Sequence, residues 1–348
     1  MHRHATGWGL RDRCATHFPL SVLPMAEGNV EIIRPVHERG SSARHVPRPV
    51  KARPVRLNED MNAEDGFRVA TLECLAQISA NIPAVRAREV EGVHQLRVGL
   101  RRLHTGLFAF GDPFRIATVK RLRRRTKGLA GIFGPARDLD VFLEDVFAPV
   151  AQSANGNEAL AFLKNRIEDA RAKEWNEALG KLDEGGLQEF LDEVAATAEG
   201  RSWGKGSAEP ILETSARTLE ESFLRARKRA RRIDRGEDRD FHRLRIALKK
   251  LRYTAEFFEG LYKKKRLKNY LDCVRDLQDV LGGMHDVAAA RQTLMRLTAE
   301  EPASARSASQ LAYASGLITG WHESRAAGLA DKARKKWKNL NRAEQFWR

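Results

Sequence analysis

The feature that most constrains this chain is a motif that occurs twice. Residues 93–103 read VHQLRVGLRRL, and residues 241–251 read FHRLRIALKKL. Both place a histidine, an arginine and then two adjacent cations at the same spacing, with leucines between them. The correspondence continues without a gap for more than 40 residues, at a constant offset of 148 positions, to the point where Asp138 matches Asp286. Such a register is typical of an internal repeat, so we expect two copies of one structural unit.

In each copy the cations fall on one side of a helix. At about 100° per residue, His94, Arg97 and Arg101 lie within about 60° of one another, and leucines occupy the opposite face. A solvated basic face is the simplest alternative, but solvated faces normally mix both signs, and neither arc contains an acid. Like charges at i,i+4 cost about 0.2–0.5 kcal/mol per pair. A cost repeated in both copies indicates that an external anion balances the charge.

Charge is also segregated along the whole chain. Lys and Arg number 62 against 46 Asp and Glu, a net charge of +16. The segment from Arg97 to Lys127 holds ten basic residues and one acid, whereas residues 138–199 hold fifteen acids and five basic residues. Segregation of this kind predicts one strongly positive surface and a polyanionic partner, which could be nucleic acid, an acidic membrane or a phosphate polymer.

Apolar residues recur at helical spacing from Met61 onward. The first such run ends at Pro83 and consists of Phe67, Ala70, Leu72, Leu75, Ile78 and Ile82. Alternating β-branched runs are nearly absent. Short segments rich in glycine or proline separate the expected helices, at residues 110–114, 133–138, 153–157, 183–186 and 201–210. The sequence therefore predicts an all-α protein.

The domain organisation follows from the same patterns. Residues 1–60 are rich in Pro, Arg, Ser and Gly and lack apolar periodicity, so we expect a disordered basic tail that binding does not require. We expect one helical domain over residues 61–348. Its first repeat covers about 61–182, its linker about 183–207 and its second repeat about 208–348.

The sequence gives no sign of export or of a membrane span. Cys14, Cys74 and Cys273 lie far apart and have no metal-binding spacing, which favours a reducing compartment. The most apolar late stretch, residues 311–321, is about half of the roughly 20 residues that a spanning helix needs. The first 25 residues lack the unbroken apolar region of a signal peptide. We expect a cytoplasmic protein with no membrane partner, no metal and no cofactor.

The repeated segments resemble those of one known family. VHQLRVGLRRLHTGLFAF followed by LAGIFGPARDLDVFLEDV, and FHRLRIALKKLRYTAEFFEGLY with LQDVLGGMHDV, are similar to the two halves of the CHAD family, the conserved histidine α-helical domain. The resemblance covers about residues 61–348. It implies two four-helix bundles related by pseudo-twofold symmetry, a basic channel or cleft between them, and binding of inorganic polyphosphate.

The resemblance also implies which residues line the channel. They are His94, Arg97, Arg101 and Arg102 from one half and His242, Arg245, Lys249 and Lys250 from the other. Further candidates are Arg124, Lys127, Arg137, Arg252, Arg275 and His285. The sequence departs from the family pattern at His104, where arginine is usual, and at GGMHD (282–286), which replaces the typical RD ending of that turn.

Other functions stay open at this point. A nucleic-acid-binding protein would also be basic, although neither arc carries an aromatic residue that could stack on bases. His94 and His242 could bind a metal with Asp138 and Asp286, but neighbouring cations repel metal ions, and these acids are better suited to capping a helix or orienting arginines. A metal-dependent phosphate-processing protein is the remaining alternative, although the chain has no ExExK motif, Walker loop or Ser/His/Asp arrangement.

The expected function is therefore non-catalytic binding of polyphosphate. Association with polyphosphate granules, a regulatory partner and storage would all use the same groove. The net charge also predicts weak, non-specific binding to nucleic acid.

Overall fold

The computed structural model of the protein describes residues 47–110, 116–184, 186–200, 207–299 and 304–348, apart from the side chains of Ile116 and Asp183. Tertiary contacts divide the chain into two units, residues 1–45 and 46–348, and all described residues belong to the second. The regular elements of that unit are α-, 3-10 and π-helices, and no described residue belongs to a named strand. The prediction of an all-α protein is confirmed.

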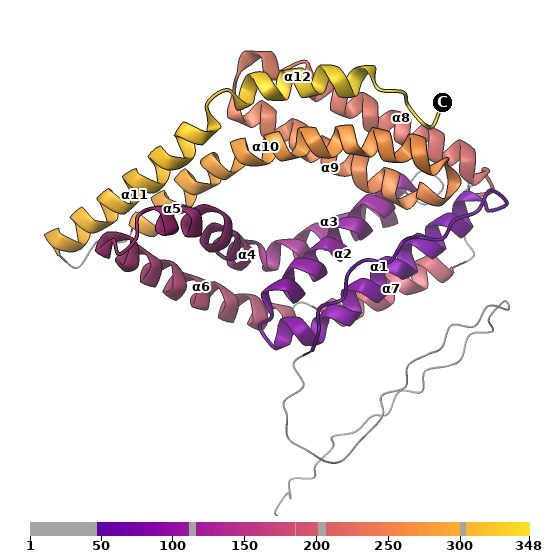
Figure 1. Ribbon diagram of the computed structural model, residues 1–348. Helices are drawn as coiled ribbons and strands as arrows, with labels where there is room; N and C mark the ends of the chain where they lie inside the picture. The colour runs from indigo at the N-terminus through magenta and orange to yellow at the C-terminus, as the bar shows by residue number, and fades with distance from the viewer. Residues whose placement is uncertain (1–46, 111–115, 185, 201–206, 300–303) are drawn as a thin grey trace, which may run out of the picture. The chain divides into compact units, whose positions relative to one another are not determined.

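The helices form two consecutive series (Figure 1). The first series consists of α1 (Ala63–Arg86), α2 (Val90–Ala109), α3 (Ile116–Ile132), α4 (Gly134–Val141), the π-helix η1 (Phe142–Phe147), α5 (Ala148–Ser153), α6 (Glu158–Glu184) and α7 (Leu187–Glu199). The second consists of α8 (Ile211–Ala230), η2 (Ile233–Arg235), α9 (Asp238–Phe257), η3 (Glu259–Leu261), α10 (Lys264–Thr298), α11 (Ala305–Ala326) and α12 (Leu329–Arg342). Pairs that are adjacent in sequence pack together, as α1 does with α2 and α8 with α9.

The internal repeat is visible in the helix bounds. Both ends of α2, Val90 and Ala109, lie 148 positions before the ends of α9. The helices before and after this pair also begin 148 positions apart, α1 with α8 and α3 with α10. The element bounds thus keep the register seen in the motifs. The arrangement of the two series as bundles about a pseudo-twofold axis stays a prediction.

The two series differ most in α10. This helix runs for 35 residues, whereas the matching part of the first series is divided into α3, α4, η1 and α5. Pro135 occupies the first turn of α4, and proline cannot donate the backbone hydrogen bond that would continue α3. The equivalent residue in α10 is Gly283, which keeps its N–H. One substitution within the repeat therefore accounts for a break in one copy and a continuous helix in the other.

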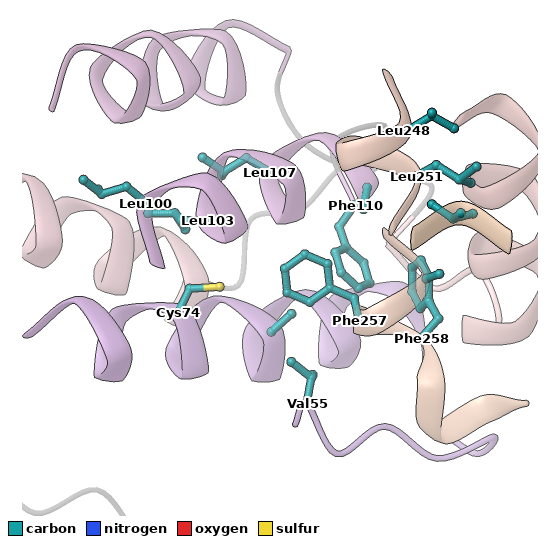
Figure 2. Packing of buried hydrophobic residues seen from close by; sticks show 14 of the residues in the cluster. Val55, Cys74, Leu100, Leu103, Leu107, Phe110, Leu248, Leu251, Phe257 and Phe258 are labelled. Atoms are coloured by element: carbon teal, nitrogen blue, oxygen red, sulfur yellow. The ribbon is translucent and has the colours of Figure 1, made fainter. Parts of the chain in front are cut away.

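The main hydrophobic cluster joins both series. The rings of Phe110 and Phe258, which are equivalent residues of the repeat, lie with their centres 5.2 Å apart. Figure 2 shows these two rings beside Phe257, between residues of α2 and α9. All three phenylalanines are buried. Because the contact joins the ends of the two motif helices, it fixes α2 and α9 against each other.

A second hydrophobic cluster lies at the other end of α10. Its buried residues come from α4, η1, α5, α6, α10 and α11, and include Phe142, Leu163, Leu294 and Ile318. The second half of α10 thus belongs to a different core from its first half. Residues 282–289 of α10, which are only partly buried, lie between the two clusters.

The predicted boundary of the tail, at residue 60, is wrong. Residues 47–60 lie against the helices, and Val55 and Leu57 are only 2% and 6% exposed. A Cβ at Gly260 would lie 2.9 Å from the carbonyl oxygen of Leu57, so this close approach requires glycine. The segment was overlooked because it contributes two apolar side chains without helical or strand periodicity. The prediction for residues 1–46 falls outside the described residues.

Two further expectations about element bounds need correction. The predicted linker, about 183–207, contains the helix α7, whose buried residues include Phe190 and Val194. Helix α1 begins with a capping box between Asn62 and Asp65 and continues through Pro83 to Arg86, because a proline near the end of a helix removes only one hydrogen bond. Leu72, expected on the apolar face, is 40% exposed.

Candidate functional site

A cavity of about 1090 Å³ lies between the motif helices and the helices that follow them. Its walls come from α2, α4, η1, α9, η3 and α10, together with residues 52–54. Ten arginines and lysines face five acids around it. The basic residues are Arg53, Arg97, Arg101, Arg102, Arg137, Arg245, Lys249, Arg252, Arg275 and Arg296, and the acids are Asp138, Asp145, Glu256, Glu259 and Asp286.

The centre of the cavity has an excess of positive charge from both repeats. Arg101 of α2 lies close enough to Arg245 and Lys249 of α9 to disfavour their charged forms. Within the described parts of the chain, none of these three cations forms an ion pair. The buried Nε of Arg101 also has no hydrogen-bond acceptor. These are donors arranged without acceptors, as an anion site requires.

Lys249 shows the electrostatic consequence most clearly. Burial is the largest cause that lowers the pKa of its ammonium, and the guanidinium groups of Arg245 and Arg101 lower it further, to about 7. A lysine in water has a pKa of about 10.4. An anion beside Lys249 would oppose both causes and favour the charged form.

Two acids moderate this field in equivalent ways. Asp138 acts on Arg97 and Asp286 acts on Arg245, in each case favouring the charged guanidinium. Partial burial raises the pKa of both carboxyls. Both residues lie inside helices, α4 and α10, so the expectation that they cap a helix is wrong. Their relation to Arg97 and Arg245 fits the other expectation, that they orient arginines.

The histidines divide between two cavities. His94 and His285 line the main cavity, whereas His242 lines a smaller one of about 340 Å³ that shares His285. The rings of His242 and His285 lie with their centres 5.1 Å apart. Burial first, and then the charge of Arg245, lowers the pKa of His285 to about 4. The imidazole of His285 is therefore neutral at pH 7 in the free protein.

The structure brings most, but not all, of the predicted residues together. His94, Arg97, Arg101, Arg245 and Lys249 line the main cavity, and so do the secondary candidates Arg137, Arg252, Arg275 and His285. Arg97 is held by a hydrogen bond from Nη1 to the carbonyl oxygen of Ala130, at 2.9 Å. Two of the others have acidic partners: Arg252 pairs with Glu256 at 3.4 Å and Arg275 with Asp272 at 2.7 Å.

Arg102 has a structural role as well as a place at the cavity. Its side chain is buried and donates hydrogen bonds to Oε1 of Gln77 and to the carbonyl oxygen of Arg53, both at 3.1 Å. Its guanidinium also lies 5.5 Å from the centre of the Phe257 ring. Two of the five N–H donors of Arg102 therefore already have protein partners.

Four predicted residues lie elsewhere. His242, Lys250, Arg124 and Lys127 are not among the residues that line the main cavity. Lys250 follows Lys249 in sequence, so its side chain leaves α9 about 100° away and faces the ring of Phe108. Arg124 and Lys127 are exposed on α3. Helical spacing predicts on which side of its own helix a residue lies. It does not predict which residues of other helices that side contacts.

Two basic residues of the cavity were not predicted from the sequence. Arg53 lies in the segment assigned to a tail, and Arg296 lies in the second half of α10, beyond the matched positions of the repeat. Nothing in the local sequence of Arg53 marks it. The uninterrupted helical pattern through residue 298 could have directed attention to Arg296.

Neither a metal-binding cluster nor a membrane-spanning helix occurs among the described residues. They contain no group of three or more His, Cys, Asp and Glu side chains placed to hold a metal ion. None of their helices is both long enough and apolar enough to cross a bilayer.

Comparison with known proteins agrees with this architecture. The sequence model of the CHAD domain matches residues 70–295. The crystal structure of the CHAD domain from the plant Ricinus communis is similar, with a TM-score of 0.70 and 27% sequence identity, over 86% of this chain and 99% of that one. PptA from Streptomyces chartreusis shares the fold, with a TM-score of 0.63 and 16% identity over 80% and 99% of the two chains. No curated protein matches the chain.

Proposed function

Because the chain belongs to the CHAD domain family, we propose that it binds inorganic polyphosphate in the cavity and does not catalyse a reaction on it. Binding of polyphosphate is a general property of the family. The proposed ligand is a linear polymer with a negative charge on each internal phosphate. Such a polymer would present many acceptors to the row of cations contributed by α2 and α9.

The observation that carries the proposal is a set of three cavity cations that form no ion pair in the described parts of the chain, namely Arg101, Arg245 and Lys249. Keeping three cations together without an anion is costly in a partly buried site. A bound phosphate would accept hydrogen bonds from the guanidinium groups in pairs and would keep Lys249 protonated. Release of the counterions that are condensed on the free polymer would add to the affinity.

The arrangement also supports binding without catalysis. Cleavage of a phosphoanhydride needs a positioned nucleophile or a metal that activates water. Asp138 and Asp286, the acids matched by the repeat, each favour the charged form of an arginine at the cavity. We propose that these acids orient donors and do not take part in chemistry. The check is to incubate the protein with long-chain polyphosphate and Mg²⁺ and to measure released phosphate, which we expect to equal the rate without protein.

The experiment that tests binding is a competition at physiological salt. Fluorescently labelled long-chain polyphosphate is bound to the full chain and displaced by unlabelled polyphosphate, duplex DNA or single-stranded RNA. We expect polyphosphate to compete at concentrations at least about tenfold lower, in phosphate units, because nucleic acid would engage only through its backbone charge. Equal competition by all three would instead support a general polyanion-binding surface.

The proposed ligand would also determine where the protein acts. We propose that it associates with polyphosphate granules in the cytoplasm. Fluorescence imaging of the tagged chain, with and without depletion of cellular polyphosphate, tests this directly.

A further inference from the structure

A second group of cations lies outside the cavity, around the ring of Phe108 near the end of α2. The guanidinium of Arg225 lies 4.3 Å from the centre of this ring, that of Arg123 lies 5.6 Å away and the ammonium of Lys250 lies 5.9 Å away. We define the Phe108 cluster as Phe108, Arg123, Arg225, Lys250 and the nearby His104. Its members come from α2, α3, α8 and α9, and none of them lines the cavity.

The positive charge of the Phe108 cluster is poorly compensated. Arg225 pairs with Glu221 at 3.5 Å, but in the described parts of the chain Arg123 and Lys250 form no ion pair. The buried Nε of Arg123 has no hydrogen-bond acceptor. The face of an aromatic ring attracts cations but does not neutralise them. Arg123 and Lys250 therefore still lack an anion among the described residues.

The ionisable groups of the cluster respond to one another. Burial first, and then the charges of Arg123 and Arg225, lowers the pKa of Lys250. Burial first, and then the charges of Arg123 and Lys250, lowers the pKa of His104 to about 4. No carboxylate acts on either group strongly enough to offset these causes. Three helices, α3, α8 and α9, thus bring like charges together around one ring of α2.

The cluster continues the cationic face of α2 away from the cavity. At about 100° per residue, Arg97, Arg101, His104 and Phe108 all lie within about 60° of one another around the helix axis. At about 1.5 Å per residue, Phe108 lies about 10 Å beyond Arg101 along that axis. A linear anion that follows this face would leave the cavity at Arg101 and reach the Phe108 cluster next. A compact anion could not occupy both places.

We propose that the Phe108 cluster is a second anion site, which binds a further phosphate segment of the polymer held in the cavity. The inference rests on the proposed function for its ligand, but on separate residues for its site. A polymer that occupies both sites would gain affinity because binding at the first raises its effective concentration at the second. Affinity should therefore increase with the length of the polyphosphate by more than the added charge of the polymer explains.

The test uses two adjacent lysines that face different sites. Lys250→Met removes a charge from the Phe108 cluster, and Lys249→Met removes one from the cavity, so each variant is the matched control of the other. Tripolyphosphate and long-chain polyphosphate are titrated into the full-length wild type and each variant by calorimetry. Thermal melting of each protein is measured beside the titrations. Arg225→Met replaces Lys250→Met if that variant melts at a lower temperature.

If the inference is correct, tripolyphosphate binds the wild type at two sites per chain, and each variant loses one of them. Lys250→Met should also weaken long-chain binding about three- to tenfold and reduce the slope of log K against log salt by about one. Unchanged stoichiometry and affinity in Lys250→Met would overturn the second site. If Lys250→Met loses tripolyphosphate binding and Lys249→Met does not, the second site is supported and the cavity proposal is wrong. A wild type that binds neither ligand would sink both.

Discussion

Nη2 of Arg102 donates a hydrogen bond to the backbone carbonyl oxygen of Arg53, at 3.1 Å. This bond joins a motif helix to a segment that the sequence marks only as a basic tail. Asn81 joins the same segment from α1, because its side chain exchanges two hydrogen bonds with the backbone of Val50. The wall of the cavity near Arg53 therefore depends on residues that precede the first helix.

Removal of this segment should destabilise the protein. A shortened chain that begins at Met61 loses the buried side chains of Val55 and Leu57, each of which contributes about 1.5–3 kcal/mol by burial. We expect a lower melting temperature and weaker polyphosphate binding. A chain that begins at Pro47 is the matched control, because it keeps these contacts. Identical melting curves for the two shortened chains would contradict the role given to residues 47–60.

The unpaired cations at the cavity should contribute more to polyphosphate affinity than the net charge of the protein does. The double variant Arg101→Met/Arg245→Met removes one cation from each repeat, and Lys332→Met/Lys338→Met removes the same charge from the exposed side of α12. We expect the cavity variant to lower polyphosphate affinity at least about tenfold, since charge-assisted hydrogen bonds contribute about 1.5–3 kcal/mol each. The α12 variant should lower it far less. Equal, small losses measured at several salt concentrations would show that net charge alone does the binding.

Affinity should fall as pH rises above about 7. In the free protein the pKa of Lys249 is about 7, and a bound phosphate would raise it toward the usual value of about 10.4. Between these values binding must take up a proton, so affinity decreases with rising pH. Calorimetry from pH 6 to pH 9, in buffers of different ionisation enthalpy, measures this uptake. Lys249→Met should abolish the uptake in that range, and persistence of the uptake would assign it to another group.

Lys249 should also make the stability of the free protein depend on pH, with the opposite sign to the affinity. The unfolded chain binds more protons than the folded chain between about pH 7 and about pH 10, so the contribution of Lys249 to stability improves as pH rises. Below pH 7 the buried charge costs its full amount. We expect Lys249→Met to be more stable than the wild type at pH 6, with the difference shrinking by pH 9. Denaturant titrations at both pH values check the sign.

The break between α3 and α4 suggests a test within the repeat. Gly283→Pro would copy Pro135 into the continuous helix α10, where the N–H of residue 283 belongs to the backbone ladder. Proline inside a helix costs about 3 kcal/mol or more, so we expect a markedly lower melting temperature. Gly283→Ala separates the loss of the N–H from crowding, because an added Cβ would lie 3.1 Å from Cδ1 of Leu329. A proline variant as stable as the alanine variant would show that α10 tolerates the break found in α3 and α4.

Much of the fold was readable from the sequence, for physical reasons. Helical periodicity and the offset of 148 positions placed α1, α2 and α9, because amphipathic patterns report which side of a helix is buried. The same patterns identified Arg97, Arg101, Arg245 and Lys249 as one cationic face, and the structure places all four at the cavity. The family resemblance is confirmed by the match over residues 70–295.

The remaining features depend on tertiary contacts that no local pattern encodes. Val55 and Leu57 lie in an extended segment whose burial depends on Gly260, about 200 positions later in the chain. Arg102 and Lys250 are equivalent residues of the repeat, yet one meets Gln77 and Phe257, whereas the other meets Phe108. Equivalent positions acquire different neighbours because the surrounding side chains have diverged.

The continuity of α10 determines how the protein should come apart. Its first half contributes Leu271 and Leu277 to one hydrophobic cluster, and its second half contributes Leu294 and Leu297 to the other. Neither cluster can lose its share of the helix without straining the residues between them, several of which line the cavity. The two clusters should therefore unfold as one cooperative system, with calorimetric and van't Hoff enthalpies that agree. A polymer bound against residues 282–289 would stabilise the part of α10 that connects the two hydrophobic clusters. Binding should therefore slow amide hydrogen exchange in both clusters at once.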